Sequence, residues 1–284
     1  MGMELVGHLQ ALWRYPVKSM LGERLERLEV DRRGGLGDRG YALWDLEAGR
    51  VASAKNPRPW GNLLAYSARY LEEPRRGEPL PVVEVEGPLV GPQTPPLTLR
   101  SDDPELVERL SQRLGRRVSL LDQPPAGASL DQYWPQVEGR AFQNVTNELV
   151  LPEGTFHDAC PIHAITSATL AALRRLEPTL DFAVERFRPN LLIEPAPGLE
   201  GFVEERWQGG TLAIGEQLIL RVEGGCSRCV ITTLPQGQLP QELEILRATA
   251  RHNRVTAGIR LSVEQPGTLA VGDPVRWTPA AAPA

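Results

Sequence analysis

Apolar residues between Leu5 and about Val118 occur in short runs that glycine and proline interrupt. These runs alternate apolar and polar positions or are rich in β-branched and aromatic side chains, which is the pattern of β-strands. The clearest runs cover residues 9–15, 41–44, 64–70 and 82–86. Many short strands with frequent turns are typical of an antiparallel barrel or sandwich, so this half is predicted to be mainly β.

One helix is predicted in this half, between Pro104 and Gly115. Proline suits the first turn of a helix, and glycine commonly follows its last turn. Val107, Leu110 and Leu114 form an apolar stripe along one face of this segment. The spacing indicates a helix that packs one face against the strands.

The second half combines strands with two predicted helices. One helix is predicted from Ser167 to Leu176, with Thr166 or Ser167 as its cap, and the other over about 240–247. Predicted strands cover 190–194, 210–215, 217–222, 259–263 and 274–277. The expected fold class is therefore mainly β with a few helices, that is, α+β.

Composition along the chain suggests a boundary near its middle. Residues 123–139 are rich in proline and glycine and show little periodicity, so we expect a linker between a domain at 1–122 and a second at 140–278. Residues 279–284 contain only proline and alanine and are expected to be a disordered tail. The sequence contains no G-x-G-x-x-G or Walker-type loop, so a Rossmann or P-loop fold has no support.

Charge and cysteine content exclude several classes of protein. The net charge of −5 argues against a general nucleic-acid binder. No basic segment followed by an apolar one opens the chain, and no apolar run reaches about eighteen residues, so we expect neither a secretory signal nor a membrane span. Three cysteines, an odd number, make a disulfide framework unfavourable. The expected location is the cytoplasm.

The cysteine pair in Cys226-Ser-Arg-Cys229 is the strongest candidate for chemistry. An arginine between two thiols favours the thiolate, which is a nucleophile and a soft metal ligand. A structural zinc site would need further ligands at a recognisable spacing, and Cys160 and the histidines do not provide one. A thioredoxin-type pair would precede a helix, whereas β-branched residues 230–233 favour a strand. Two incidental buried thiols remain an alternative.

Several other polar residues follow strands or turns where they can be exposed to a ligand. Lys18 and Ser19 lie after Pro16 on a predicted turn, Arg39 lies on another turn, and Arg188 and Asn190 precede an apolar strand; each could bind a phosphate or a pterin edge. Taken singly, each of them is more often a surface residue.

Residues 156–167 run from a loop through a strand to a helix cap, a junction that often lines a pocket. Within this segment His163 alternates with apolar residues, so it is expected to be a core histidine.

These segments, in this order, resemble the MOSC family, the molybdenum-cofactor-binding domains related to the C-terminal part of molybdenum cofactor sulfurases. With the N-terminal half included, the chain resembles the mitochondrial amidoxime-reducing branch of that family and its bacterial relatives. The pieces that carry the resemblance are 15–19 (YPVKS), 38–39 (DR), 53–55 (SAK), 158–167, 187–190 (FRPN), 226–233 (CSRCVITT) and 266–274. Together they span nearly the whole chain.

The resemblance implies an N-terminal β-barrel-like domain followed by a MOSC β-barrel domain. It also implies that Cys229 ligates molybdenum and is the catalytic cysteine of a molybdenum-dependent oxidoreductase. The residues implied to bind the molybdenum cofactor, a molybdopterin, are Lys18, Ser19, Arg39, Thr166, Ser167, Arg188, Asn190, Ser227 and Arg228. A dithiolene-bound molybdenum needs one more soft thiolate, and a pterin phosphate suits arginine and lysine.

The expected reaction is the reduction of small N-hydroxylated compounds. The sequence has no ferredoxin cysteine spacing and no flavin or nicotinamide fingerprint, so electrons are expected from a separate donor of the ferredoxin, flavin reductase or cytochrome type. Two alternatives remain open: a carrier of the cofactor or of sulfur without its own reductase activity, and a thiol–disulfide protein that uses Cys226 and Cys229.

The sequence departs from the amidoxime-reducing pattern at two places. Residues 234–237 read Leu-Pro-Gln-Gly where relatives commonly have an Asp-Pro turn, and Arg260 stands near the last strands where those enzymes carry a tyrosine. Both differences are expected near the cofactor rim and therefore bear on the choice of substrate.

Overall fold

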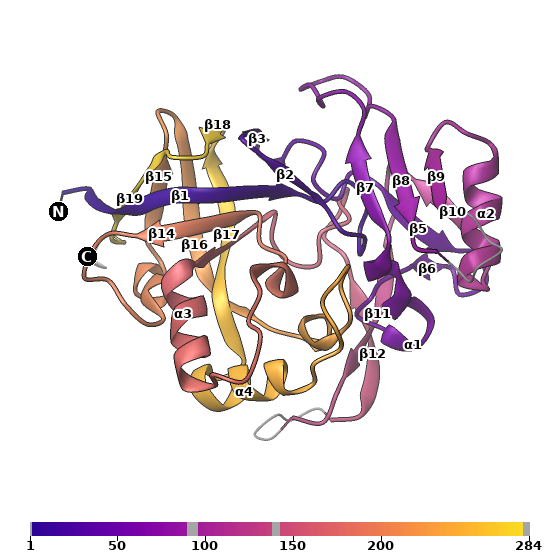
Figure 1. The fold of residues 1–284 in the computed structure, drawn as a ribbon. Helices are drawn as coiled ribbons and strands as arrows, with labels where there is room; N and C mark the ends of the chain where they lie inside the picture. Colours follow the sequence, from indigo (N-terminus) through magenta and orange to yellow (C-terminus); the bar gives the residue numbers. More distant parts are fainter. Residues whose placement is uncertain (1, 90–95, 138–142, 281–284) are drawn as a thin grey trace.

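The computed structural model describes residues 2–89, 96–137 and 143–280. Its central element is a barrel of seven strands in the order β14-β13-β17-β16-β15-β19-β1, closed by pairing of β1 with β14. A further strand, β2, extends the sheet by pairing with β1 (Figure 1). The bounds are β1 Glu4–Arg14, β2 Glu23–Leu25, β13 Ile162–Thr166, β14 Leu191–Pro195, β15 Thr211–Ile214, β16 Leu218–Ser227, β17 Thr256–Gln265 and β19 Pro274–Thr278.

The barrel is filled by alternate apolar side chains of its strands. Leu12, Ile193, Leu220, Ile259 and Val275 are fully buried in one cluster. Because successive side chains of a strand point to opposite faces, this alternation lets each strand present one apolar face to the interior. The predicted mainly β class is confirmed.

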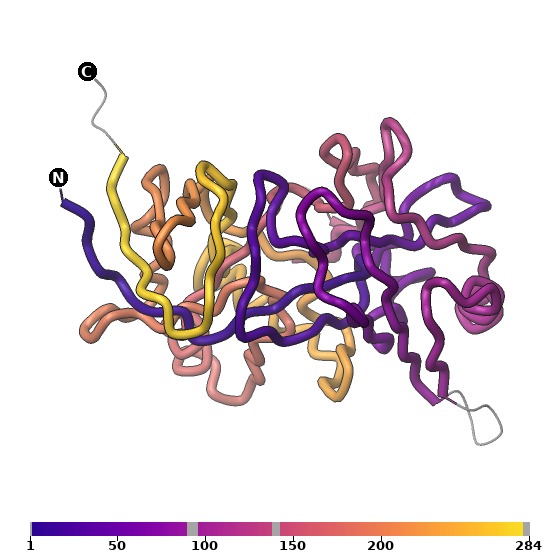
Figure 2. The backbone as a smooth tube through the Cα atoms, turned by 90° about the horizontal axis from the view of Figure 1, so that it is seen from above, coloured from indigo at the N-terminus to yellow at the C-terminus, as the bar shows by residue number. Residues whose placement is uncertain are grey.

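Strand β1, from the N-terminal end of the chain, is part of the barrel that the second half forms. It pairs antiparallel with β19, in register Glu4 with Trp277, and with β14, in register Leu9 with Ile193. Figure 2 shows the two chain ends at the same side of the molecule. A second connection joins β18 (Gly267–Ala270) to β3 (Arg27–Asp31), which pairs with β4 (Gly34–Gly35). The predicted division at 122 and 140 therefore separates segments that share ladders, and it stays a prediction.

Most of the N-terminal half forms two small sheets beside the barrel (Figure 1). One has the order β10-β5-β6 and the other β7-β8-β9. Their bounds are β5 Ala42–Asp45, β6 Arg50–Val51, β7 Ser67–Tyr70, β8 Val83–Gly87, β9 Leu97–Arg100 and β10 Val118–Leu121, with the short helix α1 at Pro57–Trp60 and a 3₁₀ turn η1 at Gly61–Ala65. The predicted helix is confirmed as α2, Glu105–Leu114, which ends where Gly115 adopts a left-handed φ of 67°.

A hairpin lies between these sheets and the barrel. It consists of β11 (Ser129–Trp134) and β12 (Val145–Val150). Strand β11 falls inside the predicted linker, and Leu130 on it is fully buried with Ala42 and Val51. Strand β11 within the predicted linker is thus packed, because its apolar side chain Leu130 completes a small core.

Helices cover one side of the barrel. Helix α3 is Ser167–Leu176, as predicted, and α4 is Glu244–Asn253, several residues later than predicted (Figure 1). Three further 3₁₀ turns are η2 Val184–Phe187, η3 Val203–Trp207 and η4 Val230–Thr233. Among the described residues, no helix has the length and apolar character needed to cross a membrane.

The prediction of a strand at residues 230–233 is wrong. These residues form η4, a single 3₁₀ turn that begins directly after Cys229. The hydroxyl of Thr232 donates to the carbonyl oxygen of Cys229 at 3.0 Å, and that of Thr233 donates to Val230 at 2.7 Å. Such local side-chain bonds compete with a ladder and override the β propensity of the segment.

Candidate active site

A cavity of about 440 Å³ lies where the end of the barrel meets the N-terminal sheets and the β11–β12 hairpin. We call it the thiol cavity, because all three cysteines of the chain, Cys160, Cys226 and Cys229, line it. Eight of the ten site residues expected from sequence also line it: Lys18, Ser19, Arg39, Arg188, Asn190, Ser227, Arg228 and Cys229. Segments far apart in the sequence therefore converge here.

The other two expected residues, Thr166 and Ser167, lie outside this lining. Thr166 is fully buried and caps α3, where its Oγ1 accepts from the Thr169 amide at 3.1 Å. The same hydroxyl donates to Glu204 at 2.6 Å. The geometry gives Thr166 a capping role in α3, and the sequence had already indicated that position as a helix cap.

Three lining residues hold a strained backbone. Ser19, Arg39 and Arg188 have φ angles of 65°, 50° and 51°, in the left-handed region that non-glycine residues seldom occupy. Each such residue costs on the order of 1–3 kcal/mol, and this strain concentrates at functional sites. Backbone hydrogen bonds hold the turns. The Arg39 amide donates to the carbonyl oxygen of Tyr15 at 2.7 Å, and the Arg188 amide donates to the carbonyl oxygen of Glu185 at 3.1 Å.

One wall of the cavity places two guanidinium groups on one aromatic ring. Arg39 and Arg188 lie 4.5 and 4.4 Å from the ring centre of Tyr15. Arg39 forms an ion pair with Asp38, which also accepts from the Tyr15 amide at 2.9 Å. This arrangement fixes both cations by stacking, and only Arg39 has a carboxylate partner in the described structure.

Arg188 retains an unfilled donor. Its Nη2 donates to the carbonyl of Met20 at 2.7 Å, but its buried Nη1 has no hydrogen-bond partner in the described structure. Burial lowers the pKa of Arg188 to about 10, so the group stays charged at neutral pH. A buried unpaired donor costs about 1–3 kcal/mol, and an anion in the cavity would remove that cost.

A second group of charges shares one carboxylate between two lysines. Nζ of Lys18 lies 2.5 Å from Asp158 Oδ1, and Nζ of Lys55 lies 3.1 Å from Oδ2. Burial alone would raise the pKa of Asp158, but the two ammonium groups hold it well below its usual range. The sequence pointed to Lys18 as a ligand group, and Lys55 and Asp158 lie in segments that carry the resemblance, but nothing in the sequence indicated that the three groups pair.

The third group surrounds Cys226. The guanidinium of Arg228 donates from Nη1 to Cys226 Sγ at 3.0 Å and from Nη2 to the carbonyl of Phe187 at 2.6 Å. Its Nε is buried and unpaired within the described residues. Nε2 of His163 lies 3.3 Å from Arg228 Nη1. His163 is buried, as expected of a core histidine, but it also lines the cavity and contacts the guanidinium of Arg228.

The position of Cys226 follows from irregular pairing of β16 with β17. The register shifts between Val222 and Gly224 and again between Gly225 and Ser227. Such bulges redirect side chains near sites. Burial raises the pKa of Cys226, but His163, Arg228 and Lys55 outweigh burial and lower it to about 6. The arginine of the motif therefore stabilises a thiolate, and the sulfur that it contacts is that of Cys226.

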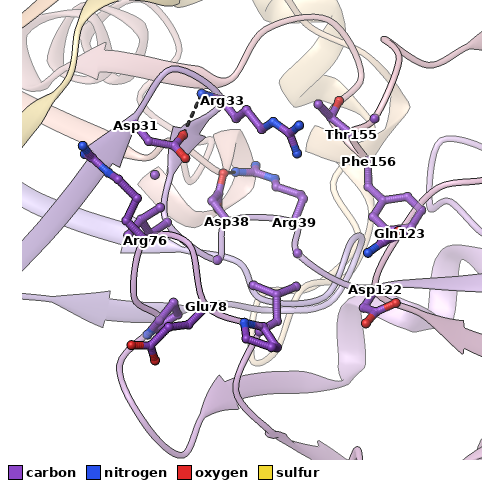
Figure 3. Close-up of a pocket in the computed structure, with 18 of the residues that line it drawn as sticks. Asp31, Arg33, Asp38, Arg39, Arg76, Glu78, Asp122, Gln123, Thr155 and Phe156 are labelled. Carbon is purple, nitrogen blue, oxygen red and sulfur yellow. Dashed lines mark hydrogen bonds and ion pairs between the residues drawn. The ribbon is translucent and has the colours of Figure 1, made fainter.

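A second, larger cavity adjoins the first. This loop cavity, of about 680 Å³, is lined by residues of 31–40, 74–80, 122–124 and 154–157. It shares Arg39, Phe156 and His157 with the thiol cavity. Figure 3 shows Asp31, Arg76 and Glu78 on one side of it and Asp122, Gln123 and Phe156 on the other. Burial lowers the pKa of His157 to about 4, so the shared wall carries a neutral imidazole at pH 7.

The thiol cavity suits an anionic group that brings a soft metal. It offers unpaired buried N–H donors on Arg188 and Arg228, and it offers thiol sulfurs. In the described residues no three histidine, cysteine, aspartate or glutamate side chains are grouped to hold a metal ion by themselves. The donor set is compatible with a phosphate-bearing metal cofactor.

Comparison with known proteins matches two family models to this chain. The model of the MOSC domain matches residues 152–276, and the model of the MOSC N-terminal beta barrel domain matches residues 6–60. A solved structure of the YUAD protein from Bacillus subtilis aligns over 97% of this chain and 98% of that one, at 12% identity and a TM-score of 0.48.

Curated relatives give a distant but nearly full-length match. Mitochondrial amidoxime-reducing component 1 of Homo sapiens is 26% identical, over 96% of this chain and 83% of that protein. Mitochondrial amidoxime reducing component 2 of Rattus norvegicus is 27% identical, over 96% and 84%. Molybdenum cofactor sulfurase 2 of Culex quinquefasciatus is 40% identical over 30% of this chain and 11% of that protein. The chain is a MOSC-domain protein with a MOSC N-terminal beta barrel domain.

Proposed function

We propose that this protein binds a molybdenum cofactor in the thiol cavity and reduces N-hydroxylated compounds. The observation that carries the proposal is the convergence of Cys229 with two buried guanidinium groups, those of Arg188 and Arg228, each of which keeps one nitrogen without an acceptor in the described structure. The MOSC domain and the names of the nearly full-length relatives support the same reading.

The chain's own residues would divide the work of holding the cofactor. Cys229 would supply the thiolate ligand, and Lys18, Arg39 and Arg188 would bind the phosphate by charge-assisted hydrogen bonds. Ser19, Asn190, Ser227 and Arg228 would complete the pterin site. Stacking on Tyr15 holds both Arg39 and Arg188 in place before any ligand arrives, and Arg39 is held further by its ion pair with Asp38. Fixing these side chains in advance lowers the entropic cost of binding.

The reaction requires electrons from outside the chain. Two electrons and two protons convert an N-hydroxylated compound into its reduced form and water, with cleavage of one N–O bond. The bound cofactor would supply two-electron exchange at the metal. We infer a separate donor of the ferredoxin, flavin reductase or cytochrome type, and we place the reaction in the cytoplasm.

Elemental mass spectrometry of the purified chain tests cofactor binding. The wild type and Cys229→Ser are produced in a host that makes the cofactor, with Cys160→Ser as the matched control because it removes another cysteine of the same cavity. We expect near-stoichiometric molybdenum in the wild type and in the control, and loss in Cys229→Ser. A folded wild type without molybdenum or pterin would refute the proposal.

A carrier of the cofactor or of sulfur is the second candidate. The local match to a molybdenum cofactor sulfurase and the presence of three thiols in one cavity favour it. Reduction of benzamidoxime by the loaded protein with a reduced dye separates the two functions. We expect turnover with the dye and none with NADH alone; a molybdenum-loaded chain that never reduces the compound would be a carrier.

A further inference from the structure

Arg260 is a cation of the thiol cavity that the cofactor proposal does not use. It lies on β17, opposite His163 of β13 and Gly224 of β16. Its Nε donates to the carbonyl of Gly225 at 3.2 Å, which ties the guanidinium to the strand that carries Cys226. Arg260 is partly buried, and no carboxylate of the described residues lies within ion-pair distance of it.

The cations of this cavity form separate groups. Arg39 and Arg188 stack on Tyr15, and Lys18 and Lys55 share Asp158. Arg260 lies on the sulfur side, because its Nε donates to the carbonyl of Gly225, the residue that precedes Cys226. The phosphate-binding groups and Arg260 therefore serve different parts of the cavity.

The strand residue opposite this guanidinium, Gly224, carries no side chain. Gly224 has a φ of 143°, and a Cβ added there would meet Gln208 Nε2 at 3.4 Å and Arg260 Nη2 at 3.7 Å. A Cβ at position 224 would stand at van der Waals distance from the terminal nitrogen of Arg260, and a longer side chain would extend from there beside it, whereas glycine places no side chain there. The two terminal nitrogens form a planar fork that matches a carboxylate.

We propose that Arg260 binds a carboxylate or similar anionic group of the substrate, next to the N–O bond that is reduced. This inference rests on the proposed function, because it assigns a substrate class to the same site. A substrate must approach the sulfur side to reach a metal held by Cys229, and Arg260 is the cation on that side without a described anionic partner or a role toward the cofactor. The preferred substrates are N-hydroxylated compounds that carry a negative charge.

Calorimetric binding of two isosteric compounds tests the proposal without turnover. The probes are 4-carboxybenzamidoxime and 4-carbamoylbenzamidoxime, which differ in charge but hardly in shape. The molybdenum-loaded wild type should bind the carboxylate about tenfold more tightly than the carboxamide, as expected for a charged hydrogen bond at a partly solvated site. The preference should weaken as salt is raised.

Variants assign that preference to one residue. Arg260→Gln should bind both probes equally, and Arg260→Lys should keep part of the preference because it retains the charge but not the fork. The control is Arg221→Gln, which removes the same charge from β16 outside the cavity, where Arg221 pairs with Glu264. It should keep the wild-type preference.

The outcomes separate this inference from the proposed function. Equal binding of both probes by the wild type, binding of neither, or a preference that survives in Arg260→Gln would overturn the role of Arg260. A preference that depends on Arg260 would support it even if reduced dye produced no amidine, and in that case only the proposed reaction would fail.

Discussion

The two adjoining cavities differ more in charge than in size. The loop cavity is larger, but its lining holds four arginines against four carboxylates, mostly on exposed loops. The thiol cavity holds six lysines and arginines against one carboxylate, Asp158. Lys18, Arg188 and Arg228 in its wall are each less than a tenth exposed. Because burying uncompensated charge is costly, the smaller cavity is the one built for an anionic ligand.

The largest expected effect is a difference in molybdenum content between two variants, each of which lacks one arginine of one cavity. Arg188→Gln removes the cation of the thiol cavity that stacks on Tyr15 and keeps one nitrogen without an acceptor in the described structure. We expect molybdenum content to fall by about tenfold or more. Arg33→Gln removes an arginine from the loop cavity and should leave the content unchanged. Elemental mass spectrometry of both folded variants measures the difference. Equal losses in the two variants would mean that the charge comparison does not locate the ligand.

Asp158 provides the next test, because it neutralises two buried lysines. Asp158→Asn should destabilise the chain by about 2 kcal/mol, a value reduced from that of a fully buried pair because the carboxylate is a third exposed. Asp122→Asn in the loop cavity removes an exposed carboxylate and should change stability by less than about 0.5 kcal/mol. Urea denaturation at pH 7 compares the variants.

The pH dependence of this effect has a defined sign. The folded-state pKa of Asp158 is depressed below the value of an unfolded chain, so its stabilisation is complete above the unfolded value of about 4. It is lost as the pH falls below that value toward the folded pKa. The difference in stability between wild type and Asp158→Asn should therefore shrink below about pH 4. A difference that stayed constant there would show that charge does not cause it.

The smallest expected effect distinguishes two thiols of the same cavity. In cofactor-free chains that retain one cysteine each, alkylation of Cys226 by iodoacetamide should rise with pH around a midpoint near 6. Cys160 should stay slow at pH 7, because burial raises its pKa to about 12. Arg228→Gln should move the Cys226 midpoint upward by about one unit. Identical pH profiles for the two cysteines would contradict the environment described for Cys226.

Local patterns in the sequence predicted the elements that depend on local chemistry. Helices α2 and α3 follow from apolar spacing and from their end residues, Pro104, Gly115 and Thr166. The turns that hold Lys18 and Arg39 follow from nearby proline and glycine. These features need no knowledge of distant partners, so composition and spacing suffice.

Features that depend on distant residues could not be predicted in this way. The pairing of Lys18 with Asp158 and of His163 with Arg228 joins positions 140 and 65 residues apart. The β-branched residues after Cys229 led to the wrong prediction of a strand, because hydrogen bonds from the threonine hydroxyls to preceding carbonyls decide their conformation. Closure of the barrel by β1 depends on strands from the opposite end of the chain. Periodicity indicates which face of a strand is buried but not which strand lies next to it.

That closure has a consequence for how the molecule folds. Strand β1 precedes all of its barrel neighbours in the chain by more than 170 residues, apart from the short β2. During synthesis its apolar face emerges long before β14 and β19 exist to cover it, so a hydrophobic strand must wait unpaired. Contacts this distant in sequence slow folding, because the entropy of closing the loop must be lost before they form. The barrel should therefore be among the last parts to consolidate, and the cavity at its end can be completed only after the whole chain is available.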